Sequence, residues 1–173
     1  MRESTGTWYR NMKNERGITL VELLIVISIV VILAVALGFS FQGWMTRYNV
    51  ESQIKQMYID LMNTRIRAMQ RNRMQFVSLT ATGYTVYEDT SPAPDGNGTY
   101  DSGSDTQILQ KNLAKAITFT AGNPLSFNTQ GLLASSEGAI QVSESTDSDY
   151  DCISLSTSRI KMGKWNGTSC DIK

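Results

Sequence analysis

The strongest constraint in this sequence is a run of 24 residues, Leu23–Thr46, that contains no charged side chain. As an α-helix this run would extend ~36 Å, which exceeds the ~30 Å hydrocarbon thickness of a bilayer. Its first part, Leu23–Leu37, is apolar on every face except at Ser28. A helix that is apolar all round needs lipid or other helices around it. We therefore expect a membrane anchor here.

The residues before this run favour an anchor over an ordinary secretory signal. Residues 1–17 are polar and carry four basic against two acidic side chains. Because positive flanks stay in the cytoplasm, we expect the rest of the chain to lie outside it. A cleaved secretory signal has an apolar region of only ~7–15 residues, followed by small residues. Ala34 and Ala36 could form such a cleavage site, so this alternative stays open.

Glu22 is the acidic residue at the start of the apolar run. A carboxylate within a bilayer costs about 2.5–3.5 kcal/mol at the helix centre and less near an end, so such residues are commonly paired and functional. The alternative is that Glu22 lies in the first helical turn and faces the lipid headgroups. An acidic residue there also favours the helix dipole.

Residues 16–24, with the sequence RGITLVELL, resemble the class III signal of type IV prepilins and type II secretion pseudopilins. The resemblance implies that a prepilin peptidase cleaves after Gly17 and that the new N-terminal residue, Ile18, is methylated. It also assigns Glu22 to a pairing with the terminal amine of a neighbouring subunit. Such a pairing would neutralise both charges and fix the axial register of apolar helices. One departure is that many major pilins have a proline where this chain has Phe39.

A helical period continues after the apolar run and stops near Gln75. Apolar residues from Trp44 to Arg73 recur mainly every three or four positions. We predict one helix over 18–73, with 18–46 as its transmembrane or filament-core half and 47–73 as an amphipathic stem. The stem carries six basic and two acidic residues. We interpret them as a solvated face, with a specific anion-binding role as the alternative.

From residue 74 the apolar pattern changes to a period of two, which predicts strands. We expect a hairpin and then short strands, over 76–80, 84–87, 107–110, 117–120, 125–127, 139–143, 152–156 and 160–163. Loops are expected over 91–105 and 144–151 because these segments are polar and rich in turn residues. The predicted fold class is α+β, with a long N-terminal helix packed on a small antiparallel β head formed by residues 74–173.

Later segments resemble one branch of the pilin superfamily, the GspH/FimT group. Residues 60–72 are similar to the helix end of that group, and residues 127–131 and 153–161 are similar to its later strands. Ser158 stands where the group usually has a glycine before arginine. The resemblance implies a minor pilin that starts or forms the tip of a type IV pilus. The alternatives are a type II secretion pseudopilin of the H kind and a DNA-uptake pilin.

The chain has two cysteines, Cys152 and Cys170. If the head lies outside the cytoplasm, a disulfide is their natural state. Closing a loop of about 18 residues would contribute roughly 3 kcal/mol in the entropic description. The alternative is two reduced, inert thiols.

The composition argues against an enzyme. The chain contains no histidine, which excludes histidine-based catalysis and histidine-ligated metals. Asp147, Asp149 and Asp151 alternate as in some calcium loops, but the glycine and glutamate of an EF-hand loop are missing. We therefore expect no catalytic residue, metal or cofactor. A membrane-anchored enzyme is an alternative that this composition disfavours.

A basic element near the C-terminus raises the question of nucleic acid. Arg159, Lys161, Lys164 and Trp165 are candidate DNA contacts, since alternate residues of a strand share a face. However, residues 74–173 contain eleven acidic and six basic side chains, a net charge of about −5. Long-range attraction of DNA would then be unfavourable, and we expect no nucleic-acid partner.

The family resemblance also implies partners and a location. The expected partners are other pilin or pseudopilin subunits, the prepilin peptidase, an inner-membrane assembly platform and membrane lipid. The chain would first cross the inner membrane once, with its N-terminus in the cytoplasm and its head in the periplasm. It would then enter a filament.

Overall fold

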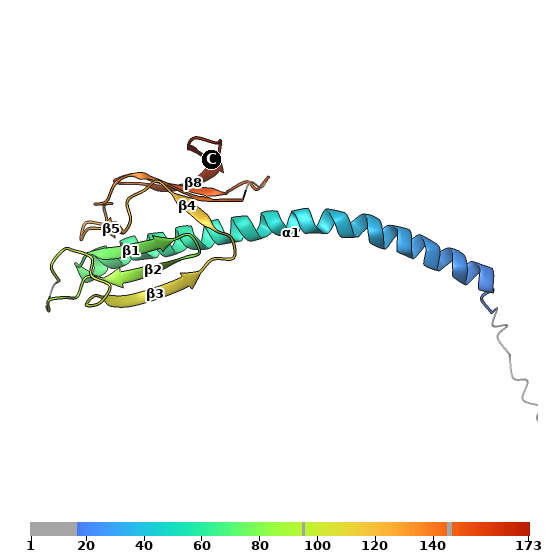
Figure 1. Cartoon of the computed structure of the whole chain (residues 1–173), viewed down its shortest axis with the longest axis horizontal. Coiled ribbons are helices and arrows are strands. Elements are labelled where there is room, and N and C mark those ends of the chain that lie inside the picture. The colour runs from blue at the N-terminus through green and yellow to red at the C-terminus, as the bar shows by residue number, and fades with distance from the viewer. Residues whose placement is uncertain (1–16, 95, 145–146) are drawn as a thin grey trace, which may run out of the picture. The chain divides into compact units, whose positions relative to one another are not determined.

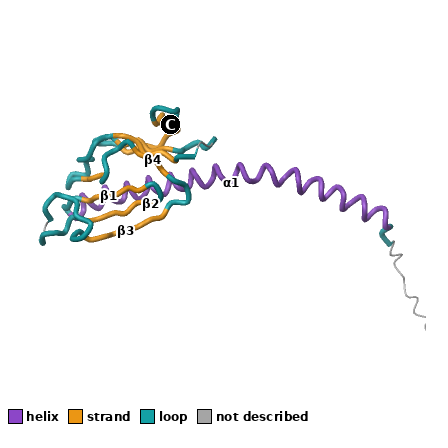
Figure 2. Tube along the Cα trace, in the orientation of Figure 1, coloured by secondary structure: helices purple, strands orange, loops and turns teal. Residues whose placement is uncertain are grey.

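The computed structural model describes residues 17–173 except 95 and 145–146, and it describes no side chains over 36–42. The chain divides into two units, Met1–Phe41 and Gln42–Lys173. Within the described residues, one helix, α1 (Leu20–Arg71), is followed by nine strands (Figure 1, Figure 2). The predicted leader, residues 1–17, lies outside the described residues except for Gly17.

The C-terminal end of α1 is closed by a left-handed residue. Asn72 has a φ of 52°, and the backbone N–H of Arg73 donates to the carbonyl of Ala68 at 3.3 Å. This is the Schellman arrangement, and asparagine tolerates the left-handed conformation better than most residues. The helix therefore covers Leu20–Arg71, slightly shorter at both ends than the predicted 18–73.

The strands form two antiparallel sheets. The first has four strands in the order β3-β2-β1-β5, namely β1 (Gln75–Thr80), β2 (Gly83–Glu88), β3 (Thr106–Asn112) and β5 (Leu125–Phe127). The second has five strands in the order β4-β6-β7-β8-β9, namely β4 (Ile117–Phe119), β6 (Gly138–Val142), β7 (Cys152–Leu155), β8 (Ile160–Trp165) and β9 (Cys170–Ile172). The α+β fold with antiparallel strands confirms the predicted class.

One hydrophobic core joins both sheets to the C-terminal part of α1 (Figure 1). The helix contributes side chains at spacings of three, four and seven, which are Val50, Ile54, Met57, Leu61 and Ala68. The first sheet contributes Val77, Leu79, Tyr84, Val86, Leu125 and Phe127, and the second contributes Ile117, Ile140, Val142, Ile153, Leu155 and Ile160. The predicted amphipathic stem is therefore the element on which both sheets pack.

The loop between β2 and β3 is held by two buried carboxylates. Asp89 accepts the backbone N–H groups of Asn97 and Gly98, at 3.1 and 2.7 Å. Asp105 accepts the backbone N–H groups of Thr90 and Asp101, at 3.3 and 2.8 Å. Buried carboxylates need such donors to offset the loss of water. The long polar loop expected over 91–105 is thus an ordered connection.

Two details of the second sheet differ from the prediction. β8 extends to Trp165, which the sequence placed in a turn, and β9 was not predicted at all. β9 has only three residues, Cys170–Ile172, and these carry no alternating pattern long enough to recognise. Its pairing with β8 aligns Trp165 with Cys170.

Candidate functional site

The first turn of α1 is built by Thr19 and Glu22. The Thr19 Oγ1 accepts the backbone N–H of Glu22 at 3.2 Å, and the Thr19 carbonyl accepts the N–H of Leu23 at 3.1 Å. A threonine at the N-cap with a glutamate three residues later is the sequence pattern of a capping box. The T-x-x-E spacing from Thr19 to Glu22 carries this signal in the sequence, but the prediction gave a role to Glu22 alone.

The residues proposed for processing lie just before this cap. Gly17, Ile18 and Thr19 are outside the helix and exposed. A side chain built at Gly17 would meet no atom within 4 Å. A peptidase needs an accessible, non-helical segment, and these three residues provide one.

The apolar side chains that follow are exposed along the whole described part of the N-terminal unit. The large apolar residues from Ile18 to Val35 are each at least 52% exposed. Among the described residues, no helical stretch is both long and apolar enough to cross a membrane. The predicted anchor, residues 18–46, includes 36–42, whose side chains lie outside the described residues.

A second set of exposed apolar residues lies on the stem. At 3.6 residues per turn, Tyr48, Ile59 and Ile66 fall on the side of α1 opposite the buried Met57 and Leu61. Their exposed fractions are 59%, 49% and 40%. Trp44 stacks on Tyr48 with 5.9 Å between ring centroids, at the start of the same stripe. The stem therefore has one apolar face covered by the head, and on its other side exposed apolar residues alternate with polar ones such as Ser52 and Lys55.

The head carries a disulfide between Cys152 of β7 and Cys170 of β9, with 5.9 Å between the two Cα atoms. The bond passes over β8 at Gly163, which pairs with Cys152 in the sheet. A Cβ at this glycine would lie 2.1 Å from the Asp171 carbonyl oxygen and 3.1 Å from Cys170 Sγ. Only glycine therefore lets β9 and the disulfide lie this close to β8.

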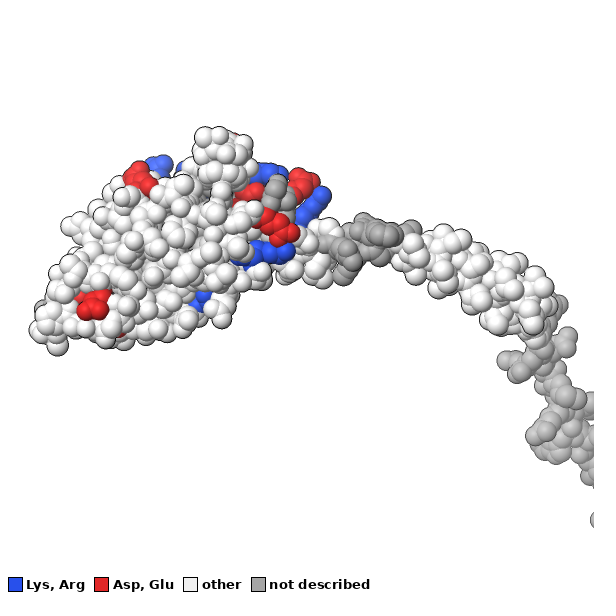
Figure 3. Space-filling view, viewed as in Figure 1, with Lys and Arg blue, Asp and Glu red and all other residues white. Residues whose placement is uncertain are grey.

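The acidic loop after β6 is tied to the stem and the C-terminus. Asp147 makes ion pairs with Arg47 (3.0 Å) and Lys164 (3.3 Å), and Asp149 pairs with Lys173 (2.6 Å). The hydrogen bond from Lys173 is the main reason that the pKa of Asp149 is lowered. Figure 3 shows side chains of both signs gathered in this region.

The same loop also contacts the stem through its backbone. Asp149 donates its N–H to Glu51 Oε1 at 2.9 Å, and this bond is the first cause of the lowered pKa of Glu51. Asp151 accepts the N–H of Trp165 at 2.6 Å. Within the described residues, no group of histidine, cysteine or acidic side chains is arranged to hold a metal ion. The three alternating aspartates have protein partners instead.

The structure separates the four candidate DNA contacts. Lys164 pairs with Asp147, and Arg159 lies in the turn between β7 and β8, where its N–H donates to Ser156. Lys161 and Trp165 share one face of β8, and Lys164 lies on the other. These residues therefore do not form one continuous basic strip along the strand.

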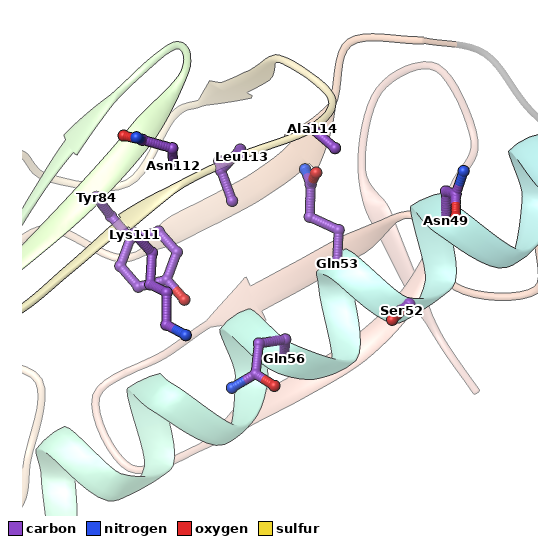
Figure 4. A pocket seen from close by; sticks show the side chains of 9 residues that line it. All are labelled: Asn49, Ser52, Gln53, Gln56, Tyr84, Lys111, Asn112, Leu113 and Ala114. Atoms are coloured by element: carbon purple, nitrogen blue, oxygen red, sulfur yellow. The ribbon is translucent and has the colours of Figure 1, made fainter.

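A polar groove of about 420 Å³ runs between α1 and the end of β3. Figure 4 shows Gln53 of the helix pointing toward Leu113 and Ala114, with Tyr84 and Lys111 farther along the groove. Gln53 is fixed by two hydrogen bonds to the backbone of Lys115, at 2.8 and 2.9 Å. The groove is thus a solvent-open seam between stem and head, and four of its nine lining residues are amides.

Next to this groove the buried Tyr84 donates its hydroxyl to Asp60 Oδ2 at 2.6 Å. Burial raises the pKa of Tyr84 far above its ordinary range, and the Asp60 carboxylate raises it further. The tyrosine is thus a permanent hydrogen-bond donor that fixes the stem to β2. Asp60 also accepts a bond from Gln56 at 3.1 Å. This pair could not be predicted from sequence patterns, because its partners are 24 residues apart.

Two family models match the chain. The prokaryotic N-terminal methylation motif matches residues 12–38, which include Gly17, Ile18 and Glu22. The family described as type II transport protein GspH matches residues 53–159, from the stem to the turn before β8. No curated protein and no solved structure matches the chain. The predicted prepilin-type signal and the GspH/FimT resemblance are therefore confirmed, and the families are structural pilins and pseudopilins. The chain belongs to the GspH family of type IV pilin-like proteins.

Proposed function

We propose that this chain is a minor pilin, a structural subunit that helps to start a type IV pilus or forms part of its tip. Before assembly it would be anchored in the inner membrane, with the N-terminus in the cytoplasm and the head outside. The observation that carries the proposal is the start of α1. There an exposed glycine, a capped helix with Glu22 in its first turn and a long exposed apolar surface follow one another.

In the proposed processing step, the peptidase cleaves between Gly17 and Ile18, and Ile18 is then N-methylated. The helix begins at Leu20, so the new amine would lie two residues before the first turn. The capping bond from Glu22 uses its backbone N–H and leaves its carboxylate available. The carboxylate of one subunit could then meet the amine of its neighbour, which removes two charges from an apolar filament core.

The exposed apolar surfaces support assembly with other helices. The N-terminal unit and the stripe of Tyr48, Ile59 and Ile66 together leave apolar residues uncovered on both halves of α1. Soluble monomers rarely expose contiguous apolar surface of this kind unless it meets a membrane or a partner. Lipid before assembly and neighbouring subunits afterwards would provide that environment.

The disulfide supports a head outside the cytoplasm, since disulfides persist in the periplasm and are rare in the cytosol. Disruption of Glu22 tests the assembly role. Glu22→Gln should still be cleaved and methylated but should assemble poorly, whereas the control Glu51→Gln on the stem should assemble normally. Normal filament assembly by Glu22→Gln would contradict the proposed pairing.

A second candidate is the H-type pseudopilin of a type II secretion system. The observation that favours it is the description of the matching family as a type II transport protein. Both candidates require the same processing and the same helix packing. Deletion of the gene in its own host separates them. Loss of surface pili with normal protein export would support the minor pilin, and loss of export with normal pili would support the pseudopilin.

A further inference from the structure

The five-stranded sheet turns one face into the core and the other outward. The inward face carries Ile140, Ile153, Leu155 and Ile160, which are buried. Because side chains alternate along a strand, Gln141, Ser154 and Trp165 lie on the outward face. Lys161 and the Cys152–Cys170 disulfide share this face, which otherwise carries small and polar residues around one indole ring.

Trp165 stands between two hollows on this face. One has a volume of about 420 Å³ and reaches Glu137 and Ser154. The other has a volume of about 300 Å³ and reaches Thr118 and Gln141. Both are bordered by the half-buried Trp165, which also borders a third hollow of about 360 Å³ that is lined by Lys164 and Lys173. An indole placed this way offers a flat apolar surface to a ligand.

The two hollows differ in the hydrogen-bond acceptors that a ligand can reach. Gln141 Oε1 is buried and has no hydrogen-bond partner among the described residues. Because this oxygen is closed to solvent, a ligand in the hollow would bond to more exposed groups. Glu137 already accepts the N–H and hydroxyl of Thr157, both at 2.6 Å, and the hydroxyl bond is the main cause of its lowered pKa. Glu137 is thus a carboxylate at neutral pH, and within the described residues its other oxygen accepts no hydrogen bond.

The charge of these hollows selects against anions. Within the described residues, no lysine or arginine lines either of them, and Glu137 places a negative charge in the larger one. The ligand that fits is uncharged, rich in hydroxyl or amide N–H donors and able to lay an apolar face on an indole. A pyranose ring has these properties, because its edge carries hydroxyl groups and its faces carry C–H groups.

We propose that the outward face of the second sheet binds an uncharged glycan chain, with one sugar ring stacked on Trp165 and a hydroxyl donor of a neighbouring sugar bonded to Glu137. The two hollows on either side of the indole would take the sugars before and after the stacked ring. This site is separate from the helix surfaces used in assembly. It is equally available in a pilus or a pseudopilus subunit.

Fluorescence titration of the full chain tests the proposal. The double variant Trp8→Phe/Trp44→Phe leaves Trp165 as the only one of the three tryptophans. The protein is kept in a detergent without a sugar head group, since maltosides would compete. The probe is a hexamer of β-1,4-linked N-acetylglucosamine. We expect a saturable change in Trp165 fluorescence below about 5 mM probe, a weak affinity typical of shallow sites.

Calorimetry with the same hexamer then assigns the site. Trp165→Ala should weaken binding at least about tenfold, Trp165→Phe should weaken it less, and the control Trp44→Ala should bind as the unchanged chain does. Melting temperatures of the variants show whether the head is intact, and Glu137→Ala provides a second test away from the indole. Absence of binding by the unchanged chain would overturn the proposal. Equal binding by Trp165→Ala, or a fluorescence response to a single-stranded DNA oligomer but not to the glycan, would also overturn it.

Discussion

Similar apolar side chains are buried in one unit of this chain and exposed in the other. In Gln42–Lys173, isoleucine, leucine and valine side chains from one helix and two sheets are buried together in a common core. From Ile18 to Val35, the same residue types are at least half exposed. The head therefore buries its own apolar side chains. Those at the start of α1 are left uncovered by the rest of the described chain.

In the stem, buried and exposed apolar residues lie on two sides of the same helix. One side, with Met57 and Leu61, belongs to the core, and the other, with Ile59 and Ile66, is uncovered. Adjacent positions in the sequence therefore differ in what they contribute. Substitutions on the two sides should separate folding from assembly.

The largest expected effect on stability comes from the buried side of the stem. Leu61→Ala removes a fully buried side chain and should lower the free energy of unfolding of the head by about 2–5 kcal/mol. The control Ile59→Ala, two residues away and exposed, should change it by less than about 0.5 kcal/mol. Urea denaturation in detergent measures both. Similar losses in the two variants would mean that the stem does not have the two faces described.

The disulfide should stabilise the head without affecting the helix start. The variant Cys152→Ser/Cys170→Ser should lose about 3 kcal/mol of head stability, because its unfolded state is no longer restricted by the closed loop. The unchanged chain in reductant should match it. Cleavage at Gly17 should continue in this variant, as judged by mass. A variant whose denaturation midpoint is unchanged would show that β9 is held by its strand pairing alone.

Loss of the helix cap should affect the first turn of α1 and not the head. Thr19→Ala removes the acceptor for the Glu22 N–H and should destabilise the first turn of α1 by about 1 kcal/mol. Thr19→Ser keeps the hydroxyl and serves as the control. Amide hydrogen exchange over residues 20–24 should speed up in Thr19→Ala only, while exchange in the head stays the same. Exchange that changes in the head as well would contradict the independence of the two units.

The smallest expected effect concerns the acidic loop after β6, in which Asp149 contacts Glu51 of the stem and the C-terminal Lys173. The lowered pKa values of Glu51 and Asp149 mean that their contribution is present above the ordinary carboxyl pKa of about 4 and is lost as the pH falls through their lowered values. The pKa of Lys173 is raised by its bond to Asp149, so its contribution is lost only at alkaline pH. We expect a slightly lower melting temperature at pH 3 than at pH 6. In Asp149→Asn this difference should be smaller, and an unchanged difference would contradict the assigned pairing.

Much of the fold could be predicted from local patterns. The stem shows its helical spacing, and the hairpin of β1 and β2 shows its period of two and its turn at Ala81 and Thr82. The helix end was placed two residues late because the left-handed Asn72 leaves no periodic signal of its own. β9 was missed because a three-residue strand is specified by its neighbours, here β8 and the disulfide.

The site was less predictable, for a physical reason. The cleavage and methylation residues form a short contiguous motif, so the sequence could propose them directly. The bond between Asp60 and Tyr84, and the surroundings of Trp165, are created by strands that meet only in the folded head. Nearby positions in the sequence, such as Lys164 and Trp165, were grouped as one basic element, but the alternation of β8 sends them to opposite faces.

The most direct test of the proposed role is the intact mass of the protein extracted from membranes of its own host, with and without reductant. Processing as a prepilin predicts a mass that lacks residues 1–17 and carries one additional methyl group on Ile18. The disulfide predicts a further loss of two hydrogen atoms that reductant restores. A full-length, unmethylated mass from cells with an active prepilin peptidase would contradict assembly as a pilin-like subunit.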